Sequence, residues 1–377
     1  MVEKCRLCGC KFPDTPLLIY ENMPKAAQFL PDVETVKNEK GIDMNIFQCR
    51  GCGLVQLNSE PVSYYKEVIR AAAFSPEMKS FRINQFTTFV EQYSLYNKKV
   101  VEIGCGKGEY LLLMKQAGAN VYGIEQSAES VTYCEQAGLN ILNGFITDFP
   151  GKLKNAPFDA FFILNFLEHL PDINSILTAI RNNLTDEGIG LVEVPNFDMM
   201  LRKKVFSEFI PDHLFYFTAD TLQTALRLNG FDVISCKEIW YDYIISAVVK
   251  TRKKLDISDF HQCQTKLTQE IDAYINKFGN KRVAVWGAGH QALAMISLAK
   301  LAGKIKYVVD SAPFKQGKFT PATHIPIVSP EQLKINPVDA VIVMAAGYSD
   351  EVAKIIQQKF DKTIVVAIFR DFGLEII

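Results

Sequence analysis

The middle of the chain alternates between short apolar runs and longer segments whose apolar residues recur every three or four positions. Apolar runs of this length predict buried strands, and the periodic segments predict amphipathic helices. The expected strands are 98–103, 120–124, 158–164, 188–194 and two within 231–249, and the expected helices are 110–117, 128–137, 173–184 and 219–229. This alternation favours an α/β fold with a mostly parallel sheet that carries helices on both faces.

The segments before and after this region follow other patterns. Residues 59–97 have helical spacing and form a lead-in to the central domain, which we expect to span 59–250. A linking helix is expected within 251–280. A second α/β domain is expected at 281–377, with strands at 282–286, 306–309 and 340–345 and helices at 291–301 and from Asp350. A separate module occupies residues 1–58.

Two short cysteine motifs characterise the module at 1–58. Cys5 and Cys8 lie in one C-x-x-C-G string, and Cys49 and Cys52 lie in another. Two such motifs predict a tetrahedral zinc site, and its role is structural because four thiolates leave no coordination position open. Cys10 is close enough in sequence to replace Cys8 as a ligand. A pair of redox-active C-x-x-C motifs is the alternative, but neither copy lies in a βαβ pattern.

Composition limits the classes of partner. The 377 residues include 41 Lys and Arg and 42 Asp and Glu, which gives a formal net charge of -1. This balance provides no basic surface for nucleic acid or for an anionic membrane. The chain has no apolar signal region or spanning segment, so we expect a cytoplasmic protein with reduced thiols. We expect it to be a monomer or homodimer that acts on a small molecule.

A glycine-rich turn follows the first strand of the central domain. Glu102 precedes the alternating glycines Gly104, Gly106 and Gly108 in the pattern E-x-G-x-G-x-G. Such glycines let a ligand lie against bare backbone at a helix N-terminus. The dinucleotide pattern G-x-G-x-x-G is not met, because a glutamate holds its third position. Glu125 ends the second strand, where a carboxylate can accept hydrogen bonds from both hydroxyls of a ribose.

These features, together with the string from Asn165 to Asp172 after the fourth strand, resemble class I S-adenosylmethionine-dependent methyltransferases. The resemblance implies a Rossmann-like core whose glycine turn passes under the methionine part of S-adenosylmethionine. It also implies that the string from Asn143 to Phe145 flanks the adenine ring. The residues expected to contact this cofactor are Glu102, Gly104, Gly106, Gly108, Glu125, Gln126, Gly144, Phe145 and Asn165.

The order of the parts carries a second resemblance. A cysteine-pair zinc module, a class I methyltransferase domain and a C-terminal Rossmann-like α/β domain are together similar to the C-methyltransferases that act on nucleotide-linked keto-deoxysugars. The most distinctive matching strings lie at 283–290, 307–318 and 325–331. The resemblance implies that the C-terminal domain helps to hold a nucleotide-sugar. The residues expected to bind this substrate are Tyr216, Gly287, Gly289, His290 and Asp310.

Methylation of a carbon next to a ketone needs a base that creates an enolate and a group that stabilises the enolate oxygen. In the resembled family the base lies in a Tyr-x-Glu-His string after the fifth strand. Here His213 matches the histidine, Asp212 takes the place of the glutamate, and Ile210 stands where the tyrosine would be. His213 is therefore the expected base. His169 matches a second family histidine, which would bind the enolate or a sugar hydroxyl.

A second glycine turn supports a different class of enzyme. Gly287, Gly289 and Ala292 fit the pattern G-x-G-x-x-A, and Asp310 closes the next strand, which is typical of a nicotinamide-dependent oxidoreductase. The domain is, however, long enough for only one of the two mononucleotide-binding halves that such enzymes use. Methyl transfer to oxygen or nitrogen of another small molecule also stays open. So does a non-enzymatic zinc-ribbon adaptor with a degenerate methyltransferase fold, although the glycines and Glu125 that it would lack are present.

Overall fold

The computed structural model describes residues 2–28, 30–67, 75–371 and 373–377. Contacts along the backbone divide the chain into two compact units, Met1–Lys253 and Lys254–Ile377. The cysteine-rich module and the central domain thus belong to one unit, and the linking helix α7 (Ser258–Asn276) belongs to the other. None of the described helices is long and apolar enough to cross a membrane.

The first unit is built on a seven-stranded sheet in the order β6-β5-β4-β7-β8-β11-β10. Numbered along the chain, this order is 3-2-1-4-5-7-6, with β11 antiparallel to β8 and β10 and the other pairs parallel. The strands are β4 (Lys99–Ile103), β5 (Asn120–Glu125), β6 (Asn140–Asn143), β7 (Phe158–Leu164), β8 (Leu184–Pro195), β10 (Phe231–Ile239) and β11 (Ile244–Thr251). The strand order reverses between β4 and β7, and open α/β sheets bind ligands at such a switch point.

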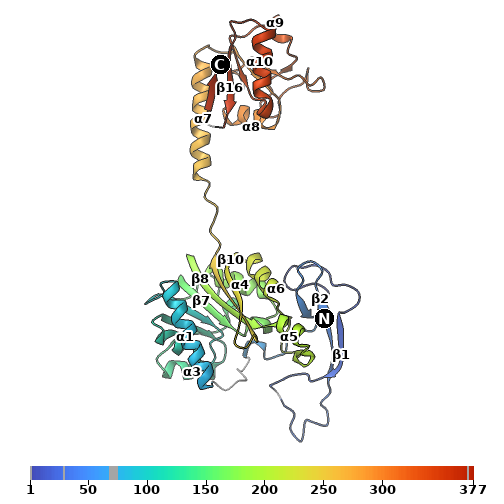
Figure 1. The fold of residues 1–377 in the computed structure, drawn as a ribbon, viewed down its shortest axis with the longest axis vertical. Helices are drawn as coiled ribbons and strands as arrows, with labels where there is room; N and C mark the ends of the chain where they lie inside the picture. The colour runs from blue at the N-terminus through green and yellow to red at the C-terminus, as the bar shows by residue number, and fades with distance from the viewer. Residues whose placement is uncertain (1, 29, 68–74, 372) are drawn as a thin grey trace. The chain divides into compact units, whose positions relative to one another are not determined.

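Helices cover both faces of this sheet (Figure 1). They are α1 (Pro76–Gln92), α2 (Glu109–Gln116), α3 (Ala128–Gln136), α4 (Ile173–Asn182), α5 (Phe197–Lys203) and α6 (Ala219–Leu228). Phe86 of α1 and Leu111 of α2 share a buried cluster with Phe162 of β7. Ile176 of α4 and Leu222 of α6 belong to another cluster, which contains the alternate residues of the same strands. Successive side chains of β7 therefore point to opposite faces of the sheet and pack into two separate clusters.

A buried ion pair fastens α1 to the sheet. Arg82 of α1 and Glu193 of β8 are both fully buried, and an Arg82 guanidinium nitrogen donates to the Glu193 carboxylate. Ser246 of β11 donates to the same carboxylate at 2.9 Å. Ser75 caps the helix by accepting from the backbone N–H of Met78, so the helix begins at Pro76. The long helix of the lead-in therefore begins later than the predicted start at residue 59. Residues 65–67 form a short 3-10 turn, and residues 68–74 lie outside the described residues.

The cysteine-rich module forms a second, antiparallel sheet that borrows a strand from the central domain. Its own strands are β1 (Leu18–Met23), β2 (Ile42–Gln48) and β3 (Val55–Leu57). The fourth is β9 (Phe215–Tyr216), which pairs with β3 through Val55 opposite Tyr216. Because β9 begins only two residues after His213, the module fixes the path of the segment that carries the expected base.

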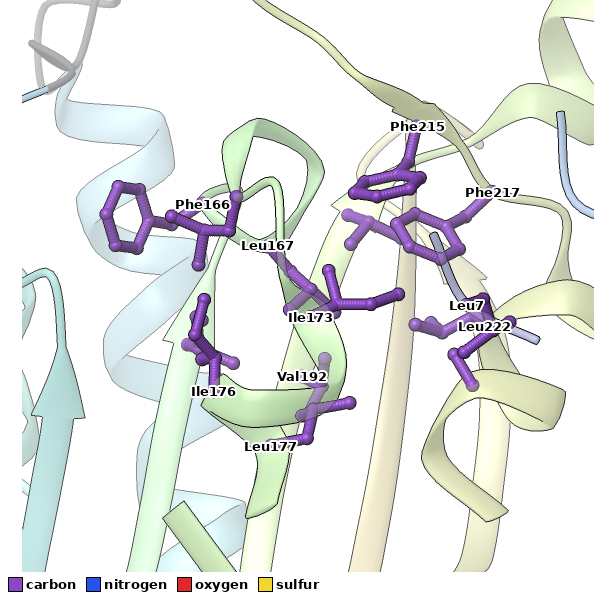
Figure 2. Close-up of a cluster of buried hydrophobic side chains, with 14 of the residues drawn as sticks. Leu7, Phe166, Leu167, Ile173, Ile176, Leu177, Val192, Phe215, Phe217 and Leu222 are labelled. Carbon is purple, nitrogen blue, oxygen red and sulfur yellow. The ribbon is translucent and has the colours of Figure 1, made fainter. Parts of the chain in front are cut away.

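Apolar side chains continue this junction into the main core. In Figure 2, Leu7 of the module lies at the same end of a buried cluster as Leu222 of α6 and Phe217, away from Phe166. All four side chains are less than a tenth exposed. Burying a Leu or Phe side chain contributes about 1.5–3 kcal/mol. Separating the module from the core would therefore expose several well-packed side chains at once.

The second unit contains a six-stranded sheet in the order β14-β13-β12-β15-β16-β17. Its strands are β12 (Val283–Trp286), β13 (Val308–Val309), β14 (Ile327–Val328), β15 (Ala340–Val343), β16 (Val365–Arg370) and β17 (Gly373–Ile376), and its helices besides α7 are α8 (His290–Leu298), α9 (Gln332–Ile335) and α10 (Ser349–Lys359). All neighbours pair in parallel except β16 and β17. Leu267 and Ile271 of α7 pack into the same cluster as Val285 of β12, so this helix covers the second sheet.

Candidate active site

The first glycine turn leaves bare backbone at the carboxyl end of β4. Gly104, Gly106 and Gly108 all have positive φ, at 71°, 54° and 81°. A Cβ on Gly104 would lie 2.6 Å from the ring of Phe166, whereas a Cβ on Gly106 would meet no atom within 4 Å. Packing therefore explains the glycine at 104. At 106 the open space beside the backbone is the place where a ligand can approach closely.

Glu125 organises this turn from the end of β5. One carboxylate oxygen accepts the N–H of Gly106 at 2.8 Å, and the other accepts the N–H of Ser127 at 2.8 Å. The side chain is 7% exposed, so both oxygens are held in one orientation inside the protein. A carboxylate oxygen has more than one lone pair, so each can still accept from a hydroxyl of a ligand.

Two buried polar atoms near this turn have no hydrogen-bond partner. They are Oε1 of Gln126, directly after β5, and Oδ1 of Asn165, directly after β7. Buried polar atoms without partners are rare, and a group that binds there explains them. The open space at Gly106 and these two oxygens fit a polar cofactor such as S-adenosylmethionine.

The remaining predicted cofactor residues lie around the same sheet edge. Glu102 is buried on β4, and Gly144 follows β6 with a φ of 143° and donates its N–H to the carbonyl of Glu125 at 2.8 Å. Phe145 is 7% exposed and lies under the ammonium of Lys66, which is 4.7 Å from the ring centroid. A flat, apolar wall of this kind suits an adenine ring.

Next to this edge, the buried residues Glu168 and His169 form a cluster with His213, which is partly buried. The ligand atoms of the three side chains all lie within 4.8 Å of one another, and the two imidazole centroids are 4.7 Å apart. Burial lowers the pKa of both histidines, and that of His213 falls to about 3. Both rings are therefore neutral at pH 7. Burial raises the pKa of Glu168 to about 8, and its Oε2 atom has no hydrogen-bond partner.

The tautomer of His169 follows from its surroundings. Its Nδ1 atom lies 2.7 Å from the backbone carbonyl oxygen of Asp212. A carbonyl can only accept, so Nδ1 carries the proton and Nε2 of the neutral ring offers a lone pair. His169 can therefore accept a hydrogen bond from a hydroxyl, but in this state it cannot donate one to an enolate oxygen.

The carboxylate of Asp212 is paired with groups of the N-terminal module and lead-in and not with the cluster of Glu168, His169 and His213. Its oxygens accept from the hydroxyl of Tyr64 at 2.6 Å and from the N–H of Ala27 at 3.1 Å. Its side chain thus anchors the segment that carries His213 to the N-terminal part of the unit. This geometry favours a positioning role for Asp212.

Tyr216, an expected substrate residue, uses its hydroxyl inside the same segment. The oxygen accepts the N–H of Ile210 at 2.8 Å and donates to the carbonyl of Ile210 at 3.1 Å. The residue is 3% exposed, and burial raises the pKa of its phenol. It closes the turn in which His213 lies. Leu214, the residue after His213, links this segment to two others. Its N–H donates to the carbonyl of Glu168, and the carbonyl of Leu214 accepts from the N–H of Leu57 in the module, both at 2.9 Å.

The four expected metal ligands come together at the edge of the module. The Sγ atoms of Cys5 and Cys52 are 3.6 Å apart, and those of Cys8 and Cys49 are 3.4 Å apart. All four sulfurs lie within 4.8 Å of one another. Tetrahedral zinc with bonds of about 2.3 Å places its sulfurs about 3.8 Å apart. The spacing therefore fits one zinc ion.

The backbone around these sulfurs repeats in both motifs. Gly9 and Gly53 have φ values of 74° and 78° and donate their N–H groups to the carbonyls of Cys5 and Cys49, both at 2.9 Å. Glycine is required at these turns because other residues rarely adopt this φ. Cys10 lies beside the second motif, near Gly51, but is not among the four clustered ligands.

The second glycine turn has a different balance of contacts. One oxygen of Asp310 accepts the N–H of Ala288 and the ammonium of Lys315, at 2.8 and 2.9 Å, and the other accepts the N–H of Ala312 at 2.9 Å. Burial alone would raise the pKa of Asp310, but the hydrogen bonds, chiefly from Lys315, lower it. A Cβ on Gly287 would clash with the carbonyl oxygen of Met344, so packing explains this glycine.

The other two predicted substrate residues of this turn face open space. A Cβ on Gly289 would meet no atom within 4 Å, and His290, the first residue of α8, is exposed. The structure thus leaves this backbone accessible, while it saturates the carboxylate of Asp310 with protein donors.

Comparisons with known proteins agree with these observations. A family model for a methyltransferase domain matches residues 78–236, and a model for the C-methyltransferase C-terminal domain matches residues 254–368. The C-methyltransferase NovU of Streptomyces niveus is 22% identical over 385 aligned positions, which cover 93% of this chain and 91% of NovU. The chain is a class I S-adenosylmethionine-dependent methyltransferase.

Other relatives match this methyltransferase over shorter stretches. The ubiquinone biosynthesis O-methyltransferase of Actinobacillus pleuropneumoniae is 34% identical over 104 residues, which cover 25% of this chain and 44% of that enzyme. The crystal structure of an S-adenosylmethionine-dependent methyltransferase from Clostridium acetobutylicum covers 50% of the chain and 96% of its own, with 13% identity and a TM-score of 0.39.

Two side chains of the candidate site were not predicted from the sequence. Glu168 directly precedes His169 in the sequence, and an acid between apolar residues is the signal that could have pointed to a buried carboxyl with a shifted pKa. Tyr64 had no such signal. Its contact with Asp212 joins residues 148 positions apart, and only the fold brings them together.

Proposed function

We propose that the methyltransferase C-methylates a nucleotide-diphosphate-linked keto-deoxysugar through an enolate that His213 generates. The observation that carries this proposal is the cluster of Glu168, His169 and His213 beside the sheet edge that carries the first glycine turn. The match of the C-terminal unit to a C-methyltransferase C-terminal domain and the similarity to NovU along most of the chain support transfer to carbon.

The environment of His213 keeps its ring unprotonated and so able to act as a base. Because its ring is neutral at pH 7, its lone pair is available in nearly every molecule. Burial disfavours the imidazolium that forms after proton abstraction. The negative charge that develops on the substrate at the same moment offsets this cost, because opposite charges attract more strongly where water is excluded. Proton removal is thus coupled to formation of the enolate.

Glu168 is the group best suited to receive the enolate oxygen. A carboxyl with a pKa of about 8 is mostly protonated at neutral pH and can donate a hydrogen bond. A buried neutral acid can stabilise an oxyanion without introducing a competing charge. His169, whose Nε2 only accepts, would instead bind a hydroxyl of the sugar. Asp212 and Tyr64 hold His213 in place through their hydrogen bond.

Bound S-adenosylmethionine would supply the methyl group as an electrophile. Gly106 would approach the cofactor through bare backbone, Glu125 would accept from the ribose hydroxyls, and Asn165 and Gln126 would satisfy their unpartnered oxygens. The exposed turn at Gly289 and His290 would bind the diphosphate of the substrate. The four cysteines would hold a structural zinc ion and so keep β3 paired with β9.

Proton exchange tests the proposal more directly than turnover. The full chain would be incubated in deuterated water with S-adenosylhomocysteine and a panel of nucleotide-diphosphate keto-sugars, and deuterium at the carbon beside the ketone would be followed by mass spectrometry. We expect exchange with one class of nucleotide-sugar. His213→Asn should slow it about 10²–10⁴-fold while leaving affinity for S-adenosylhomocysteine unchanged. His261→Asn, on the exposed face of α7, is the matched control.

The outcomes separate the alternatives. Full exchange in the His213→Asn variant would remove His213 as the base. Methyl transfer to a hydroxyl or amine, without exchange at any carbon, would move the methyltransferase to oxygen or nitrogen acceptors. Methyl transfer to a keto-sugar by the wild type but not by His213→Asn, with the new methyl group located on the carbon beside the ketone by nuclear magnetic resonance, supports the proposed reaction.

The zinc site has its own test. Metal analysis of the purified chain should find zinc bound by the four cysteines, and a strong chelator should slow exchange and turnover because β9 loses its partner strand. Loss of zinc with full activity would show that the module does not position His213.

A further inference from the structure

The cluster of Glu168, His169 and His213 has the composition of a transition-metal site. Two neutral imidazoles and a carboxyl group, which releases its proton when a metal binds, are ligands that zinc and related divalent cations prefer. Three protein ligands leave positions open for water or substrate. Among the described residues, one other group of three or more His, Cys, Asp or Glu side chains lies close enough together to hold a metal ion, and it is the four-cysteine cluster.

The spacing of the donors is close to that of a real site. Oε1 of Glu168 lies 3.9 Å from Nε2 of His169, and the ligand atoms of all three side chains lie within 4.8 Å of one another. Ligands at about 2.1 Å from a tetrahedral cation lie about 3.4 Å from each other. Small side-chain rotations would therefore bring the three donors to a common cation.

The surroundings already orient two of the donors. His169 donates Nδ1–H to the carbonyl of Asp212, and this type of contact turns the Nε2 lone pair of a ligand histidine toward a metal. Glu168 is 1% exposed, and its Oε2 atom is buried without a hydrogen-bond partner. Buried carboxyl oxygens without a partner are rare, and a cation bound at this place would give Oε2 a partner. His213 is only partly buried, so part of its side chain is open to solvent.

We infer that Glu168, His169 and His213 bind one divalent transition-metal cation, such as zinc or cobalt(II), and that this cation competes with proton abstraction by His213. The effect on turnover rests on the proposed function, because a lone pair that is bonded to a metal cannot accept a proton. Binding itself does not rest on it. The metal-bound chain is an inactive form, and removal of the metal restores the base.

Cobalt(II) distinguishes this site from the cysteine site. The full chain, with zinc already at its cysteines, would be titrated with cobalt(II) chloride, desalted and analysed for both metals and for its visible spectrum. We expect one cobalt per chain in addition to the zinc, with weak visible bands and without the intense sulfur-to-cobalt charge-transfer absorption that thiolate ligands give. Retention of no cobalt, or of cobalt with that absorption, would overturn the inference.

Variants tie the metal to the three side chains. Glu168→Gln and His169→Asn should each weaken cobalt binding about tenfold or more, whereas His261→Asn should bind cobalt like the wild type. Unchanged affinity for S-adenosylhomocysteine and an unchanged melting temperature would show that the variants are folded. Equal cobalt binding by a folded Glu168→Gln variant would contradict the assignment.

Proton exchange on the substrate completes the test. One equivalent of cobalt should suppress exchange in the wild type, and a mild chelator that leaves the cysteine zinc in place should restore it. Cobalt bound with full exchange would overturn the competition. If no nucleotide-sugar exchanges at all, the proposed function fails, but the metal titration still decides whether the site exists.

Discussion

Both units of the chain carry a glycine turn after one strand and an acid at the end of the next strand. In the first unit Glu125 accepts an N–H of the turn, from Gly106, and in the second Asp310 accepts an N–H of the turn, from Ala288. The shared contact explains why both sequences look like nucleotide-binding turns. In each unit the acid holds the turn against the neighbouring strand.

The two turns differ in how completely the protein satisfies them. Asp310 is paired with the ammonium of Lys315, whereas both hydrogen bonds found for Glu125 come from neutral backbone N–H groups. Gln126 and Asn165 leave buried oxygens without partners near the first turn, and the described part of the second unit contains no buried side-chain atom of this kind. An acid whose oxygens are all paired with protein donors stabilises a turn, while buried oxygens without partners leave hydrogen bonds that a ligand can supply. This difference argues against a ribose-binding role for Asp310.

The largest expected effect separates the two acids. Glu125→Ala should weaken binding of S-adenosylhomocysteine about 100-fold, because two charge-assisted hydrogen bonds to ribose hydroxyls together contribute about 3 kcal/mol. Asp310→Ala should leave that affinity within about twofold, because its carboxylate serves the other unit. Isothermal titration calorimetry on the full chain measures both. Equal losses in the two variants, or none in Glu125→Ala, would end the distinction.

We expect a smaller effect on cofactor affinity when alanine replaces one of the two glycines that face open space, Gly106 and Gly289. Gly106→Ala should lower affinity for S-adenosylhomocysteine about tenfold and stability by about 1 kcal/mol, because Gly106 has a φ of 54° and its Cβ would enter the cofactor space. Gly289→Ala should change neither, because Gly289 has a φ of -92°. Calorimetry and thermal unfolding report both quantities.

The Gly289→Ala variant also tests whether the second glycine turn binds the diphosphate of the substrate. Weaker binding of a nucleotide diphosphate by this variant, with unchanged cofactor affinity, would support a diphosphate site. Unchanged nucleotide binding would leave Gly289 without a role in the substrate site. If Gly106→Ala bound S-adenosylhomocysteine with the affinity of the wild type, the cofactor would bind elsewhere on the sheet edge and not beside Gly106.

Strands and helices were predictable from the sequence where the pattern is local. The expected strand at 158–164 is observed with the same bounds, and α2, α3, α4 and α6 each begin at or within one residue of the expected start. Their amphipathic period and their caps are encoded in neighbouring residues. The short strands β14 and β9 were not predicted, because two residues carry too little pattern and their pairing depends on distant partners.

The site was predictable only as a set of residues at the ends of strands. Parallel strands bring their carboxyl ends to one edge, so the approach of Glu125 to Gly106 follows from the order of the elements. The orientation of side chains does not. The sequence could not show that Asp212 turns toward Tyr64, that Tyr216 closes its own turn, or that Lys315 neutralises Asp310, because each depends on tertiary packing.

The smallest effect tests whether Asp310 is a structural group. Asp310→Asn should lower the stability of the second turn by about 1 kcal/mol at pH 7, since the ion pair with Lys315 is only partly screened by solvent. Because the folded pKa of Asp310 lies below its ordinary value, its contribution is present above about pH 4 and is lost as the pH falls through the folded pKa. The variant should therefore differ from the wild type at pH 7 and approach it in strong acid.

Hydrogen exchange at the N–H of Ala288 measures this contribution where it acts. Protection should fall in Asp310→Asn at neutral pH and converge with the wild type, also weakly protected, at the lowest pH at which the chain stays folded. Asp339→Asn, which removes an exposed ion pair with Arg282 in the same unit, is the matched control and should leave Ala288 unchanged. If protection in Asp310→Asn equalled the wild type at pH 7, the acid would not be needed to hold the turn, and a ligand-binding role for Asp310 would have to be reconsidered.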